Sequence, residues 1–273
     1  MFITIDIGAT NTRVAFSKDL KKLENIEKFP TPKNPEELNS KLFELFKNKQ
    51  IKAIAIGIAG PIDHYENKLI SFTNVPQYKN MKASDFIPEL KIQKALNNDA
   101  ELANLGEVNF GIKNPPSTVA YITISSGIGG ALSIDKKLLP VRFNTEPGHQ
   151  VIEIGGVEEA VSKAQGTLEA LCGGLNFKNL YGISPSKCKD KKIWESYAED
   201  LAVGLHNISL LWSPDMIILG GGLSQKSSYF LEKLKDSLSS SLKNIRPAPE
   251  IEISKLGDEN VLLGGLAVLR DFP

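Results

Sequence analysis

Three glycine-containing segments each follow a predicted strand and could turn main-chain amides toward a polyanion. They are residues 6–12 (DIGATNT), 126–130 (SGIGG) and 220–223 (GGGL). Glycine lets the main chain come close to a phosphate, and Thr10 and Asn11 add side-chain donors to the first segment. The third segment suits a flat ligand lying against the backbone. A second interpretation stays open, in which these residues only form tight turns and close strand–helix packing.

Asp99 is the acid whose position best suits base chemistry. It follows Asn98 and a short predicted strand, and it begins a helix predicted to reach about Phe110. Its carboxylate is therefore expected at an edge of the fold and not in the core. Phosphoryl transfer to a hydroxyl needs a carboxylate near the proton that the nucleophile loses. The alternative is an ordinary first-turn acid, favoured by the helix dipole.

A further set of side chains suits a ligand with many hydroxyls. Glu146 and His149 flank Pro147-Gly148, a stretch too broken for a helix, so both can project from one loop. Glu169 lies twenty residues further on. Carboxylates accept hydrogen bonds from hydroxyls, and imidazole can both accept and donate. A single histidine is also common as a surface or structural residue, and that alternative stays open.

Strands and helices are predicted to alternate, which is typical of the α/β class. Asn34 caps a helix that has Pro35 at its first position, and Pro214 follows the end of another helix. Each half of the chain opens on a strand, a glycine-rich turn and another strand, which is a weak internal echo. The predicted strands are residues 2–7, 13–17, 51–58, 118–125, 131–134 and 215–219, and the predicted helices are 34–47, 99–110, 191–211 and 227–242.

Composition narrows the possible partners. The 273 residues include 32 Lys and Arg against 32 Asp and Glu, without the basic stripe that nucleic-acid binding requires. The two cysteines are too few for a disulfide framework, which favours a reducing cytoplasm. No apolar run approaches a membrane span, and Met1 leads directly into a strand without a signal sequence. A soluble cytoplasmic protein that binds neither nucleic acid nor membrane is expected.

The order of the motifs resembles the actin-like ATPase superfold. Within it, the chain is similar to the ROK family (repressor, open reading frame, kinase), which includes glucokinases, fructokinases and N-acetylhexosamine kinases. The resemblance covers nearly the whole chain. Its most specific segments are residues 6–11, 57–61, 98–107, 125–130, 146–149 and 166–169.

The resemblance implies a two-lobed α/β fold of the ribonuclease H-like type, with a nucleotide cleft between the lobes. The expected lobes are residues 1–112, with a C-terminal helix (259–273) packing back on them, and residues 113–258. The family's repressors carry an added N-terminal DNA-binding domain. Here the first hairpin begins at residue 2, so the repressor interpretation is not expected. The family often forms dimers, which implies a homodimer.

The resemblance also implies the activity: ATP- and Mg-dependent phosphorylation of a hexose, at the 6-hydroxyl as in glucokinases and hexokinases. Asp99 would be the general base, and Asp6 would help to hold Mg directly or through water. The implied sugar ligands are Gly60, Asn74, Asn98, Asp99, Glu146, His149 and Glu169. The implied nucleotide ligands are Asp6, Gly8, Ala9, Thr10, Asn11, Ser126, Gly127, Gly220, Gly221, Gly222 and Leu223.

Two departures from the family pattern qualify these expectations. Many members follow the Gly-His pair with three cysteines that, with this histidine, bind a structural zinc. Residues 150–165 contain no cysteine, and Thr167 stands where the last one would be. No zinc site is therefore expected; His149 would serve the sugar alone, and packing, with a helix near residues 157–163, would hold the loop. The second departure is Ser125-Ser126 in place of Gly-Thr, which still provides a hydroxyl.

Three alternatives stay open. The acceptor could be an N-acetylhexosamine or fructose, because the sequence does not give the size of the pocket. The protein could be a sugar sensor without catalysis, although Asp99 argues against this. A structural ATPase of the actin or chaperone type would need polymerisation or peptide-binding segments that the sequence does not contain.

Overall fold

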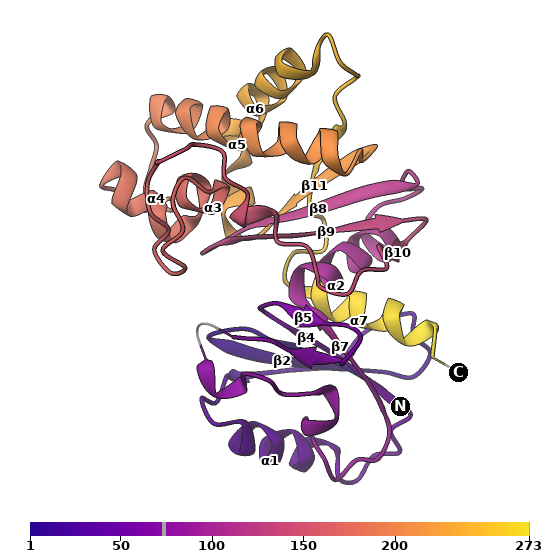
Figure 1. Cartoon of the computed structure of the whole chain (residues 1–273). Helices are drawn as coiled ribbons and strands as arrows, with labels where there is room; N and C mark the ends of the chain where they lie inside the picture. Colours follow the sequence, from indigo (N-terminus) through magenta and orange to yellow (C-terminus); the bar gives the residue numbers. More distant parts are fainter. Residues whose placement is uncertain (73–74, 273) are drawn as a thin grey trace. The chain divides into compact units, whose positions relative to one another are not determined.

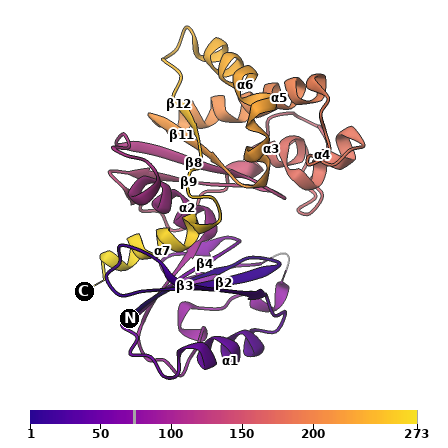
Figure 2. The same ribbon diagram turned by 180° about the vertical axis from the view of Figure 1, so that it is seen from behind.

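Each of the two units of the chain is built on a β-hairpin that parallel strands extend. The computed structural model describes residues 1–72 and 75–272. The first unit comprises Met1–Lys113, Lys136–Asn144 and Asp258–Pro273, and the second comprises Asn114–Asp135 and Thr145–Gly257. Figures 1 and 2 show the elements of both units from opposite sides.

The sheet of the first unit has the strand order β3-β2-β1-β4-β7. β1 pairs antiparallel with β2 and parallel with β4, and β4 pairs parallel with β7. All residues of β4 are buried, so this strand needs cover on both faces of the sheet. The strand bounds are β1 (Phe2–Ile7), β2 (Asn11–Ser17), β3 (Glu24–Pro30), β4 (Ala53–Ile58) and β7 (Gln93–Asn98).

Helices cover the two faces of this sheet. α1 (Pro35–Phe46) lies on one face, and α2 (Asp99–Gly106) and α7 (Asn260–Arg270) lie on the other (Figures 1 and 2). In α1 the predicted cap is confirmed, because Asn34 accepts a hydrogen bond from the N–H of Glu36. A Cβ at Gly264 would overlap the main-chain oxygen of Leu102, so glycine lets α7 and α2 approach closely.

Shorter elements complete the first unit. They are β5 (Ile62–Asp63), β6 (Lys68–Leu69), β10 (Lys137–Leu138), the 3₁₀ turns Pro76–Tyr78 and Ala83–Asp85, and a π turn, Glu107–Gly111, that continues α2. A further 3₁₀ turn, Gly257–Glu259, precedes α7.

The second unit repeats the arrangement of strands. Its strands have the order β9-β8-β11-β12, with β8 and β9 antiparallel and the other pairs parallel. The internal echo in the sequence is thus confirmed. The bounds are β8 (Thr118–Ile124), β9 (Ile128–Ile134), β11 (Met216–Gly220), β12 (Glu250–Ile253), α3 (Leu168–Cys172), α4 (Gly174–Tyr181), α5 (Lys191–Leu211) and α6 (Ser227–Leu242).

Most predicted elements are confirmed, and one is wrong. The bounds of α5 and α6 agree with the predicted helices. The helix expected near residues 157–163 is instead an irregular, turn-containing segment. Among the described residues, no helix has both the length and the apolar character that a membrane span requires.

Candidate functional site

The first predicted phosphate-binding turn connects β1 to β2. The N–H of Gly8 donates to Asn11 O at 3.1 Å and closes the turn, while Ala9 and Thr10 are exposed. Thr31, which follows β3, supports the turn: its hydroxyl donates to Gly8 O at 2.7 Å and its N–H donates to Thr10 O at 3.0 Å. The turn therefore has a braced main chain with accessible outer residues.

Asp6 lies at the end of β1 and is 5% exposed. Its register partner on β2 is Arg13, whose Nε and Nη2 lie 3.0 and 2.8 Å from Asp6 Oδ2. Burial raises the pKa of Asp6 to about 6; Arg13 opposes the rise and the charge of Asp99 adds to it. Asp6 is thus a desolvated carboxylate near a second acid, an environment that favours an additional cation.

Asn98 and Asp99 lie where β7 passes into α2. Asn98 Oδ1 accepts a hydrogen bond from Ala100 N at 2.8 Å, and its Nδ2 donates to Gly60 O at 2.9 Å. Asp99 Oδ1 accepts from Ala100 N at 2.9 Å. Burial raises the pKa of Asp99 despite main-chain hydrogen bonds that lower it. The structure therefore brings together Gly60, which follows β4, and Asn98 and Asp99 at the end of the neighbouring strand β7. Asp99 is more basic than an ordinary aspartate.

Gly60 is required by its backbone conformation. Its φ is 116°, a region that side-chain-bearing residues rarely adopt, and a Cβ there would overlap Ser71 O. In this conformation the carbonyl of Gly60 accepts the hydrogen bond from Asn98 Nδ2.

Glu101 and His64 also belong to this group, and sequence reasoning missed both. Glu101 is 4% exposed, and its Oε2 accepts a hydrogen bond from Asn98 N at 3.0 Å. Its Oε1 lies 2.9 Å from His64 Nε2, and this hydrogen bond raises the pKa of His64. A glutamate three residues after an asparagine cap is the signal of a capping box, so the spacing could have identified Glu101.

The second predicted phosphate-binding turn connects β8 to β9 and is braced by the main chain of α4. Gly174 N donates to Ser125 O at 2.8 Å, and Leu175 N donates to Ser126 O at 3.0 Å. The side chain of Ser126 remains exposed.

Glu169 lies directly against this turn. Its Oε2 accepts a hydrogen bond from Ile128 N at 2.7 Å, and a Cβ at Gly127 would lie 2.8 Å from its Cδ. Burial raises the pKa of Glu169, although the Ile128 hydrogen bond lowers it. A residue predicted to bind sugar therefore also fixes the second turn.

The third glycine segment is shaped mainly by packing. Gly221 has φ of 82°, and a Cβ at Gly220 or Gly221 would overlap Tyr121 or Ile124. No described atom lies within 4 Å of a Cβ built at Gly222, and Leu223 is 8% exposed. Gly222 is therefore the glycine of this segment with space in front of it.

Glu146 and His149 are presented by a single 3₁₀ turn, Pro147–His149, where the sequence suggested a loop. Both side chains are exposed, and a Cβ at Gly148 would overlap the main chain of β9, so the turn lies close to this strand. His149 Nδ1 lies 2.9 Å from Oε1 of Glu159. Burial acts to lower the pKa of His149, but this hydrogen bond and the charges of Glu159, Glu169 and Glu146 raise it. Glu159 was also missed, because an isolated glutamate in an irregular segment gives no sequence signal.

The remaining predicted sugar ligand, Asn74, lies outside the described residues.

The carboxylate beside the first turn fits what magnesium requires. In the described part of the chain, no group of three or more His, Cys, Asp or Glu side chains could hold a metal ion. Mg²⁺ usually keeps several waters and binds one or two carboxylates together with substrate phosphates. Asp6, a desolvated carboxylate beside the first turn, fits that mode.

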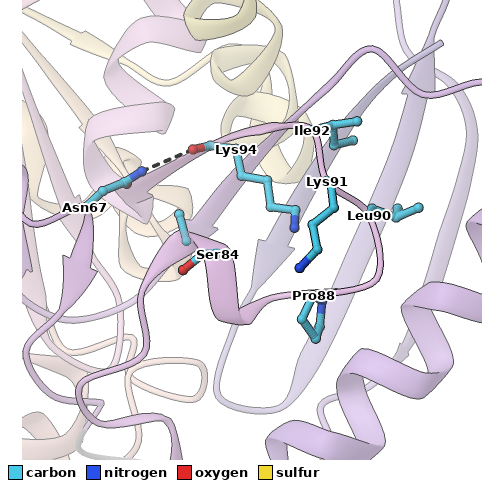
Figure 3. Close-up of a pocket in the computed structure, with 8 residues that line it drawn as sticks. Asn67, Ser84, Pro88, Leu90, Lys91, Ile92 and Lys94 are labelled. Atoms are coloured by element: carbon cyan, nitrogen blue, oxygen red, sulfur yellow. Dashed lines mark hydrogen bonds between the residues drawn. The ribbon is translucent and has the colours of Figure 1, made fainter.

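A cavity of about 230 Å³ in the first unit lies away from these residues (Figure 3). Lys94 lines it from the start of β7, whereas Asn98 ends that strand, about 13 Å further on. Lys94 Nζ donates to Ile87 O at 2.9 Å. The cavity is lined by Asn67, Ala83, Ser84, Pro88, Leu90, Lys91, Ile92 and Lys94.

Comparison with known proteins gives concordant relatives. The profile of the ROK family matches residues 2–271. A fructokinase from Lactococcus lactis subsp. cremoris is 30% identical over 234 residues, covering 82% of this chain and 79% of that protein. A glucokinase from Pyrobaculum calidifontis is 25% identical over 290 residues, covering 100% of this chain and 96% of that protein.

The fold has close structural counterparts. A ROK hexokinase from Thermus thermophilus superposes with a TM-score of 0.84 at 24% identity, covering 97% of this chain and 96% of that one. A ROK glucokinase from Streptomyces griseus, solved with glucose and AMPPNP, gives a TM-score of 0.80 at 21% identity, with 98% and 99% coverage. These likenesses confirm the predicted α/β fold of the actin-like ATPase type.

Proposed function

The chain belongs to the ROK family, and from this premise we propose that it phosphorylates the 6-hydroxyl of a glucose-type hexose. It is an ATP-dependent carbohydrate kinase. Asp99 is proposed as the base because its carboxylate lies partly exposed at the junction of β7 and α2 and because burial raises its pKa.

The proposed chemistry assigns one proton transfer to Asp99. Its carboxylate takes the proton of the sugar hydroxyl as that oxygen bonds to the γ-phosphorus of ATP. The bond between the γ-phosphorus and the bridging β,γ-oxygen breaks, and ADP leaves. Asp99 then returns the proton to solvent. A carboxylate with a raised pKa accepts this proton more readily than an ordinary aspartate does.

The two hairpin turns are proposed to contact the phosphates. Their main-chain amides and the hydroxyls of Thr10 and Ser126 are donors on exposed turns of braced shape. Gly222 would give the adenosine room against the chain. Asp6 would hold Mg²⁺, which neutralises phosphate charge when bound with the nucleotide.

Three of the proposed sugar ligands, Asn98, Glu169 and His149, have polar atoms beyond those in their hydrogen bonds within the protein. Asn98 keeps a second amide hydrogen after its bond to Gly60. Glu169 keeps Oε1, because Oε2 accepts from Ile128. Glu146 and His149 are exposed on their shared turn and can accept from hydroxyls.

Fructose is the second candidate acceptor, because the relative that is 30% identical is named a fructokinase. The test is ADP release with ATP and Mg²⁺ against glucose, mannose, fructose, N-acetylglucosamine and N-acetylmannosamine. The highest kcat/KM is expected with glucose. A preference for fructose or an N-acetylhexosamine would replace the proposed acceptor, and binding of a sugar without ADP release would support a sensor.

A further inference from the structure

We propose that Glu159 is the positioning residue for His149, holding the imidazole through Nδ1 so that Nε2 meets a sugar hydroxyl. The proposal rests on the proposed function for the role of His149 in sugar binding. It concerns a carboxylate that makes no contact with substrate itself.

Glu159 is a buried carboxylate with donors on both of its oxygens. Its side chain is 1% exposed. Oε1 receives hydrogen bonds from His149 Nδ1, at 2.9 Å, and from the hydroxyl of Thr167, while Oε2 receives one from the hydroxyl of Ser162. Buried carboxylates are costly unless several donors surround them, so this convergence indicates a built interaction.

These donors keep Glu159 ionised. Burial acts against ionisation, but the hydrogen bonds from Ser162, Thr167 and His149 lower the pKa of Glu159 below its ordinary value. An anion fixed at Nδ1 favours the tautomer with its proton on that nitrogen. Nε2 is then an acceptor when the ring is neutral and a donor when the ring is protonated.

The main chain fixes Glu159 in turn. Its N–H donates to Ala164 O at 2.8 Å, and Gly166 N donates to Val157 O at 2.8 Å, which ties the two arms of the segment together. Thr167, which binds the same carboxylate, also caps α3, the helix that carries Glu169. Glu159 therefore connects the orientation of His149 to the element that presents another proposed sugar ligand.

The imidazole is accessible on its other side. The His149 side chain is 45% exposed although Nδ1 is engaged with Glu159. The charged groups around it are Glu146 on the same turn, Glu169 on α3 and Glu159 itself. Glu159 forms a direct hydrogen bond to the ring, with its Oε1 2.9 Å from Nδ1.

The test is Glu159→Gln, which keeps the shape of the side chain and removes its charge. We expect the KM for the sugar to rise about tenfold, because the hydrogen bond to Nδ1 loses its charge assistance. The KM for ATP should be unchanged, and kcat should stay within about threefold. Ser162→Ala is the matched control, because it removes a donor from the same carboxylate and leaves the contact with His149; its KM for the sugar should change less than about twofold.

A spectroscopic measurement separates positioning from general loosening. The chain has only three histidines, so their Cε1–H proton resonances can be followed by NMR against pH. In Glu159→Gln the pKa of His149 should fall, because the charge that raises it is removed. If Glu159→Gln does not fold, Glu159→Asp withdraws the carboxylate from Nδ1 while keeping its charge. The KM for the sugar should again rise and the pKa of His149 should again fall.

The outcomes are distinguishable. An unchanged His149 titration, an unchanged KM for the sugar, or equal rises in both KM values would overturn the proposal. If the unsubstituted protein phosphorylates no hexose, the proposed function fails, and with it the sugar-binding role given to Glu159. The NMR comparison would then still show whether Glu159 holds His149.

Discussion

The two units hold their candidate residues by different means. In the first unit, Asp6 lies next to the last residue of β1 and Asp99 begins α2, so the main chain of regular elements sets both positions. In the second unit, His149 lies on a 3₁₀ turn and depends on Glu159 for its orientation, and Glu169 lies on the short helix α3.

The difference has a consequence for substitutions. A side chain placed by a strand end keeps its position when a neighbour changes, because many main-chain hydrogen bonds define the element. A side chain placed by a few side-chain partners moves when one of them is replaced. Substitution of Asp99 should therefore change the chemistry, whereas substitution of the residues that hold His149 or Glu169 should change sugar affinity.

The largest expected effect is that of Asp99→Asn. Asparagine keeps the shape of the side chain but cannot take the proton, so kcat should fall about 100- to 10,000-fold while the KM for the sugar changes little. Steady-state ADP release measures both. Glu36→Gln is the matched control, since Glu36 is also a first-turn helix acid but is exposed on α1. Near-normal kcat in Asp99→Asn would show that Asp99 is not the general base, and the contrast between the two units would lose its main support.

The pH dependence of kcat tests the same group without substitution. The pKa of Asp99 is raised from 3.8, so the base is protonated and inactive over a wider acid range than an ordinary aspartate. At saturating ATP and Mg²⁺, which would keep Asp6 ionised, the rate should be constant above the pKa of Asp99 and should fall up to about tenfold per pH unit below it. An acid limb centred at or below the ordinary value would contradict a desolvated base. Glu159→Gln should leave the acid limb of kcat in place.

The first unit was largely predictable from the sequence because its candidate residues follow clear signals. A predicted strand over residues 2–7 that stops at Gly8 predicted the first turn, and Asn98-Asp99 after a strand predicted a helix start. β3 was missed, because most of its residues are exposed and it lacks an alternating apolar pattern. Glu101 was missed although its capping-box spacing was readable.

The second unit was less predictable from the sequence, because side-chain hydrogen bonds hold part of it. The strands and long helices were found. Packing with a helix near residues 157–163 was expected to hold the loop at residues 150–165, but this helix is absent and hydrogen bonds to Glu159 hold the segment. Such an arrangement brings together residues that share no periodic pattern. Gly127 is similar: its sequence signal is a tight turn, whereas its neighbour in space, Glu169, is distant in the chain.

Gly127→Ala tests whether the second hairpin turn, unlike the first, is linked to sugar binding. The added methyl group would lie 2.8 Å from Glu169 Cδ, so the carboxylate must shift, and the KM for the sugar should rise about tenfold, as for one lost hydrogen bond to a charged group. Gly8→Ala is the counterpart in the first hairpin, where the added methyl would meet Asn11 O at 3.1 Å. Its effect should be confined to the KM for ATP. Equal changes in sugar affinity for both variants would contradict the link through Glu169.

The smallest expected effect is that of Thr31→Val, which removes one side-chain brace from the first turn. Valine keeps the branched shape, but the 2.7 Å hydrogen bond to Gly8 O and the 2.9 Å hydrogen bond with the Thr12 hydroxyl are lost, while the main-chain bond to Thr10 O remains. A neutral hydrogen bond contributes about 1 kcal/mol, so the KM for ATP should rise no more than about fivefold and the KM for the sugar should not change. Ser133→Ala is the control, because it removes a serine hydroxyl that donates to Val119 O within the second hairpin, away from its turn. A change in sugar affinity for Thr31→Val would mean that the first turn is not held independently of the sugar ligands, and the contrast between the two units would then have to be abandoned.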